Sequence, residues 1–133
     1  MLQTNDGSIP DYRLRGFTTR AICPQNLDDM KRDWHANSVR LMLRPDFHVR
    51  VEGFRTYREA WRHIVDSLPP WLDRARELGI AVILDLHQVP TERWKEYSSD
   101  RKKALSEFWR DDANLDVLLE CWRELADLCV NRD

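Results

Sequence analysis

Three polar side chains lie at the ends of two apolar segments, and their types suit the binding of a polyhydroxylated ligand. Arg40 lies within the segment 38–44, and Asp85 and His87 end the apolar run that begins at Ile80. A guanidinium and an imidazole that converge could hydrogen-bond sugar hydroxyls or a carboxylate. Two structural alternatives stay open: Arg40 could simply neutralise a buried carboxylate, and Asp85 and His87 could form a structural pair.

Trp94 is the aromatic candidate for the same chemistry. It lies with Trp109 in a charged stretch that follows Pro90 and is too long for an ordinary connection between a strand and a helix. An indole ring could stack on the apolar face of a pyranose, or it could equally anchor this stretch to the rest of the fold. The run 93–103 is most simply a solvated charged surface. The other four tryptophans fall on apolar stripes and are predicted to lie in the core: Trp34, Trp61, Trp71 and Trp122.

Alternating and continuous apolar segments predict the strands that position these residues. We expect strands near 12–19, 38–44 and 80–87, and the first is the weakest because it contains Gly16. The nearly continuous apolar run 80–87 is typical of a parallel strand covered on both faces. In segment 38–44 alternation places Arg40 on the face opposite Val39 and Leu41.

Apolar residues with helical spacing predict helices near 26–35, 57–78 and 114–130. Asn26 is the expected N-cap of the first helix, with Asp28 in its first turn. The adjacent prolines at 69–70 are expected to divide the second helix into two pieces, and Gly79 to end it. The third helix carries the strongest apolar stripe in the chain.

Strands that alternate with helices predict an α/β fold of right-handed βαβ units around a parallel sheet. Both a doubly wound sheet and a (β/α)₈ barrel satisfy this order. The glycines that cradle phosphate are missing after every expected strand, so we expect no nucleotide cofactor. In either architecture the ligand lies beyond the carboxyl ends of the strands, where Arg40, Asp85 and His87 are expected on one face.

Composition excludes several classes of function. The 133 residues suit one domain, 1–133, and a net charge of −2 argues against nucleic-acid and membrane-surface partners. No apolar run approaches the roughly 18 residues that span a bilayer, and residues 1–10 lack the pattern of a secretory signal, so the chain as given is expected to be soluble and cytoplasmic.

The three cysteines form no CxxC motif, so we expect reduced thiols and no metal site. Surface positions without chemical context are expected for His35, His48 and His63.

Four stretches in order resemble glycoside hydrolase family 5, the cellulase family of (β/α)₈ barrels. The most specific is 75–87, in which a helix end, a glycine stop, a buried strand and a terminal Asp-Leu-His fit together; the others are 15–17, 37–41 and 108–126. The resemblance implies a partial (β/α)₈ TIM barrel comprising the first three βα units. It also implies that Arg40 and His87 line the subsite of the scissile sugar. From the residues themselves, Asp85 is expected behind these two side chains, and Trp94 is a further candidate for substrate binding.

The resemblance implies retaining hydrolysis of a β-linked polysaccharide by two glutamates, one of which follows an asparagine. None of the five asparagines precedes a glutamate, so no catalytic residue is assigned here. We therefore expect an N-terminal fragment that is inactive alone, prone to self-association through its open edges, and secreted in the intact parent if it follows many relatives. The alternatives are a non-catalytic carbohydrate-binding protein or barrel remnant, and an unrelated α/β interaction domain.

Overall fold

The computed structural model describes residues 13–45, 47–48, 52–90, 106 and 108–130. Three strands alternate with three helices in the predicted order. Their bounds are β1 Gly16–Thr19, α1 Pro24–Trp34, β2 Ser38–Leu43, α3 Tyr57–Glu77, β3 Ala81–Leu86 and α6 Asp112–Val130.

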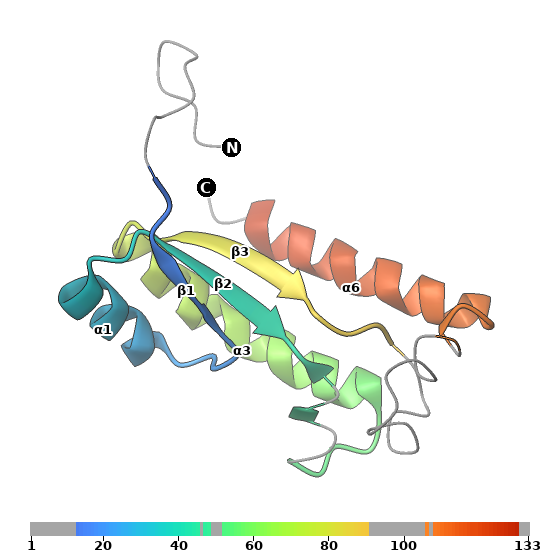
Figure 1. Cartoon of the computed structure of the whole chain (residues 1–133). Helices are drawn as coiled ribbons and strands as arrows, with labels where there is room; N and C mark the ends of the chain where they lie inside the picture. Colours follow the sequence, from blue (N-terminus) through green and yellow to red (C-terminus); the bar gives the residue numbers. More distant parts are fainter. Residues whose placement is uncertain (1–12, 46, 49–51, 91–105, 107, 131–133) are drawn as a thin grey trace.

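The strands form one parallel sheet in the order β1-β2-β3. The register pairs Gly16 with Ser38 and Ser38 with Ala81, so the three strands start at the same level. In Figure 1, α3 lies behind the sheet, α1 lies on the side of β1 and α6 on the side of β3. Three parallel strands that alternate with helices in an open sheet confirm the predicted α/β class, consistent with part of a (β/α)₈ barrel.

The core lies between the sheet and the helices, because the described helices cover only one face of the sheet. Val39, Leu41 and Leu43 of β2 are fully buried, whereas Arg40 between them is exposed. This is the alternation expected of a strand with one covered face. From the helices the cluster receives mainly aromatic and branched side chains: Leu27, Tyr57, Trp61, Ile64, Leu68, Trp71, Cys121 and Leu125.

Helix α1 begins two residues earlier than predicted. Cys23 is the N-cap and Pro24 the first helical residue, a position in which proline loses no hydrogen bond. Asn26 is therefore not the cap, and Asp28 lies beyond the first turn. The helix ends at His35, whose φ of 51° is left-handed, with the Ala36 N–H bonded to the Met30 carbonyl at 3.0 Å.

Helix α3 continues through Pro69 and Pro70, contrary to the prediction of two pieces. Its buried face extends from Trp61 to Trp71, across both prolines. The free energy gained by burying these side chains is therefore larger than the free energy lost with the hydrogen bonds that the prolines cannot donate. Gly79 ends the helix as predicted: with φ at 62°, it donates to the Arg76 carbonyl, and Ile80 donates to the Ala75 carbonyl at 2.9 Å.

Two tryptophans predicted to lie in the core are exposed instead. Trp34, at the end of α1, is 68% exposed and touches the ring of Phe17 edge-on. Trp122 is 44% exposed, because α6 packs mainly on α3 through a different side of the helix that includes Cys121 and Leu125. Trp61 and Trp71 are buried, as predicted. Among the described residues, no helix is both long and apolar enough to cross a membrane.

Candidate functional site

Arg40 and Asp85 come from neighbouring strands and meet on the open face of the sheet. The register pairs Arg40 with Ile83 and Met42 with Asp85, so Arg40 and Asp85 are diagonal neighbours with side chains on one face. The Arg40 Nη2 donates to the Asp85 Oδ2 at 2.7 Å. The sequence prediction that these strand ends share a face is thus confirmed.

His87 joins the same carboxylate from just beyond the end of β3. Its backbone N–H donates to the Leu43 carbonyl at 3.1 Å, which extends the ladder past the last strand residue. Its Nδ1 lies 2.9 Å from the Asp85 Oδ2. An ionised carboxylate only accepts hydrogen bonds, so Nδ1 carries the proton and a neutral ring keeps a lone pair on Nε2.

The exposure of the three side chains differs in a way that matters for binding. Asp85 is the most enclosed at 20%, while Arg40 and His87 are 46% and 39% exposed. The carboxylate therefore lies behind two polar groups that reach solvent. Ile83 on the same face is also exposed and adds an apolar surface beside them. Together these groups offer N–H donors, one imidazole acceptor and an apolar contact, a combination that suits a sugar.

Tyr57 holds the segment after His87 in place, although the sequence alone indicated no functional role for it. The Tyr57 hydroxyl donates to the Gln88 carbonyl at 2.9 Å, across the layers from α3 to the end of β3. Thr56 and Glu59 form a capping box that fixes the start of α3 and thereby the position of Tyr57. No spacing in the sequence links Tyr57 to Gln88, because the pair depends on how the helix lies on the sheet.

The base of β2 is held by Asn37 and by the close approach of β1. The Asn37 Oδ1 accepts from the Arg15 N–H at 2.7 Å, and its Nδ2 donates to the Arg13 carbonyl at 2.9 Å. One residue further on, a Cβ at Gly16 would lie 1.9 Å from the Ser38 carbonyl oxygen. Glycine is required there by proximity, which explains why a strand includes the residue that weakened its prediction.

The two tryptophans of the long charged stretch are not both described. Trp94 lies outside the described residues, so its predicted contact with sugar is untested. Trp109 is exposed and packs edge-on against the buried Phe108, with ring centroids 4.9 Å apart.

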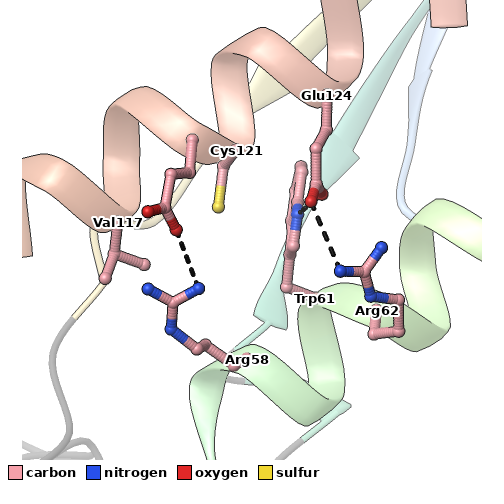
Figure 2. A pocket seen from close by; sticks show the side chains of 7 residues that line it. Arg58, Trp61, Arg62, Val117, Cys121 and Glu124 are labelled. Carbon is pink, nitrogen blue, oxygen red and sulfur yellow. Dashed lines mark hydrogen bonds and ion pairs between the residues drawn. The ribbon is translucent and has the colours of Figure 1, made fainter.

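A small pocket between α3 and α6 is lined mainly by charged and aromatic side chains that bind one another. Arg58 pairs with Glu120 at 2.8 Å, and Glu124 accepts from the Trp61 indole at 2.6 Å. Figure 2 shows the side chains of α3 and α6 that line this pocket, among them Arg58, Trp61 and Glu124. Burial raises the pKa of the Cys121 thiol in this pocket to about 12, and the nearby Glu124 charge adds to the effect. A protonated thiol is a poor nucleophile, so these residues join two helices rather than form a reactive site.

The comparisons with known proteins identify a family for the chain. The family model described as Cellulase (glycosyl hydrolase family 5) matches residues 4–129. No curated protein and no solved structure matches the chain. Since the family model covers nearly the whole sequence, the chain belongs to glycosyl hydrolase family 5, the cellulase family.

Proposed function

We propose that these 133 residues supply the sugar-positioning part of a retaining glycoside hydrolase that acts on a β-linked polysaccharide or glycoside. Membership of the cellulase family supports the relation to glycoside hydrolases. The observation that carries the proposal is the sharing of one carboxylate, Asp85, by Arg40 and His87 at the end of the parallel sheet. Ligands of parallel α/β folds bind at this end.

Each of the three residues has a distinct role in this proposal. Arg40 donates N–H groups to sugar oxygens, and the Nε2 of His87 accepts from a hydroxyl. Asp85 positions both, because it fixes the guanidinium and holds the imidazole in the Nδ1–H tautomer. Trp94 is proposed to stack on the sugar ring, whose C–H face is apolar.

The hydrolytic step itself requires groups that these residues do not supply. Retaining hydrolysis uses two carboxyl groups about 5 to 5.5 Å apart, one as nucleophile and one as acid and base. The Asp85 carboxylate is already bound to Arg40 and His87, and no asparagine of the sequence precedes a glutamate. We therefore expect the 133-residue polypeptide alone to bind glycan without cleaving it.

Binding and hydrolysis, measured on the same preparation, test the proposal. Soluble β-linked gluco- and manno-oligosaccharides are titrated into the polypeptide by calorimetry, and release from an aryl β-glycoside is followed in parallel. Arg40→Ala and His87→Ala should each weaken binding by about tenfold, or 1.4 kcal/mol. Arg62→Ala, on the helix layer, is the matched control and should bind like the unaltered chain. Equal binding by all variants, or turnover of the aryl glycoside by the pure polypeptide, would contradict the proposal.

A non-catalytic carbohydrate-binding role is the second candidate. It is favoured by the presence of a polar and apolar binding face in a sequence without the expected Asn-Glu pair. Retention on insoluble glucan or mannan that is lost in Trp94→Ala would support it, provided that hydrolysis stays absent when the polypeptide is supplied with the remaining strands of a family barrel.

A further inference from the structure

A second group of polar side chains lies where β2 leads into α3, apart from Arg40 and Asp85. It consists of His48, Glu52 and His63, and we call it the His-Glu-His cluster. The sequence alone indicates no chemical context for His48 and His63, because they lie far apart along the chain and no metal-binding motif includes either. The fold brings them together with one carboxylate.

A local backbone hydrogen bond places two of the three side chains on the same side. The Glu52 N–H donates to the His48 carbonyl at 2.9 Å, the i to i+4 bond that places two side chains on one face. The third residue, His63, comes from α3, whose start is fixed by the capping box of Thr56 and Glu59. The two imidazoles thus come from different parts of the chain, and the start of α3 is fixed on the side of His63.

The distances are close to those of a metal site. The Glu52 Oε2 lies 2.8 Å from the His48 Nδ1 and 3.7 Å from the His63 Nε2, and all three donor atoms lie within 4.8 Å of one another. Around a tetrahedral zinc ion with bonds of about 2.0 to 2.2 Å, ligand atoms are about 3.3 to 3.6 Å apart. Small side-chain rotations therefore suffice to place all three atoms around one ion.

Aromatic neighbours limit the rotation of both imidazoles. The Phe54 ring lies 5.1 Å from the His63 ring, and the Phe47 ring lies 5.8 Å from the His48 ring. The imidazoles themselves are 5.6 Å apart. Glu52 and His63 are partly exposed, so an ion can enter and keep water on its open side.

We propose that the His-Glu-His cluster binds a divalent transition metal ion, represented by Zn²⁺. Two imidazole nitrogens and one carboxylate oxygen are a borderline donor set, which favours zinc, copper or nickel over the hard ions Mg²⁺ and Ca²⁺. Binding requires His48 to move its ring proton from Nδ1 to Nε2, a change of tautomer without a change of charge. The bound ion would link the segment after β2 to α3.

Calorimetry of the chelator-treated 133-residue chain with ZnCl₂, in the presence of a non-thiol reductant, tests this directly. We expect one equivalent of Zn²⁺ to bind and the thermal midpoint to rise with Zn²⁺ but not with Mg²⁺. His48→Ala, Glu52→Gln and His63→Ala should each weaken binding by at least about 100-fold, more than the loss of a mere supporting partner causes.

The matched control is His35→Asn, which removes an exposed imidazole at the end of α1 and keeps a residue that tolerates the left-handed backbone. It should bind Zn²⁺ like the unaltered chain. Co²⁺ provides a second readout through its absorption bands. We expect the bands of tetrahedral Co²⁺ with the unaltered chain but not with folded Glu52→Gln. Zn²⁺ that stays bound in the three cluster variants, or that is lost in His35→Asn, would overturn the proposal, since thiols or other surface groups would then hold the ion.

Discussion

The Asp85 carboxylate on β3 accepts a hydrogen bond from the Arg40 guanidinium on β2 at 2.7 Å, through the same oxygen that His87 contacts. One oxygen thus determines the orientation of two side chains from neighbouring strands. Because both basic groups are partly exposed, this pairing contributes more to their placement than to the stability of the fold.

Asp85→Ala is therefore expected to reduce oligosaccharide affinity by about tenfold and the free energy of unfolding by less than about 1 kcal/mol. Nitrogen NMR of the imidazole should show the Nδ1–H tautomer of His87 in the unaltered chain and its loss in the variant. Asp66→Ala, an exposed carboxylate of α3, is the control for both measurements. A large loss of stability with an unchanged tautomer would mean that Asp85 is structural only.

Gly16→Ala is expected to destabilise the chain by about 3 kcal/mol, at the upper end of the usual cost of overpacking. The added methyl would overlap the Ser38 carbonyl oxygen, which belongs to backbone and cannot move aside without separating β1 from β2. Gly79→Ala is the contrasting variant, because its φ of 62° is strained for alanine but nothing lies within 4 Å, and it should cost about 1 to 2 kcal/mol. Denaturant unfolding compares the two, and equal losses would contradict the steric explanation.

Local periodicity predicted the sheet well, because the faces of a strand follow from alternation alone. Val39 and Leu41 are buried and Arg40 is exposed, as expected from a period of two. The role of Gly16 was not predictable in this way. It depends on the distance to the neighbouring strand, which no property of segment 12–19 encodes.

The helices show where apolar periodicity stops being informative. The stripe of α6 predicted that Trp122 would be buried, yet this side of the helix has little cover within the described part of the chain. A stripe shows that a face can be buried but does not identify its partner. The His-Glu-His cluster was missed for a related reason, since His48 and His63 meet only through the packing of separate elements.

Acid unfolding should depend on the ion pair between α1 and α3. The Arg74 guanidinium donates hydrogen bonds to Asp28 and lowers the pKa of that carboxyl below its usual value. A lowered folded pKa adds stability above the unfolded pKa of about 3.9, and this stability is lost as the pH falls through the folded value. As the pH falls below about 4, the free energy of unfolding of Asp28→Asn should therefore decline less steeply than that of the unaltered chain.

The flattening should be partial, because Arg32 lowers the pKa of Asp33 in the same range. Urea unfolding from pH 2 to pH 7 measures the slope in Asp28→Asn and in the unaltered chain. A parallel slope in Asp28→Asn and the unaltered chain would show that the pair has no linkage to folding.

The three cysteines should react at different rates. Cys129 is exposed and Cys23 is partly buried, whereas Cys121 is buried and its pKa is raised to about 12. At pH 8 Cys121 stays protonated, so we expect labelling at Cys129 first and at Cys121 only when the chain unfolds. Because the folded pKa lies above the unfolded value of 9.0, this thiol stabilises the fold below about pH 9 and less as the pH rises towards 12. Mass spectrometry of iodoacetamide-treated chain measures the order, and early labelling of Cys121 would contradict its burial between α3 and α6.

Self-association is expected to involve the uncovered side of α6. Leu115, Leu119 and Trp122 are each more than two-fifths exposed and recur with helical spacing, so they form a continuous apolar surface on one helix. Light scattering should show a mass that rises with concentration, because pairing this surface with a second copy removes it from water.

The double variant Leu119→Glu, Trp122→Glu should lower that mass at a cost in stability near the ±0.5 kcal/mol usual for surface substitutions. Leu14→Glu, which alters an exposed apolar residue ahead of β1, should not lower it. If the unaltered chain stays monomeric at every concentration, association does not occur; if only Leu14→Glu dissociates it, copies pair through the edge at β1 instead.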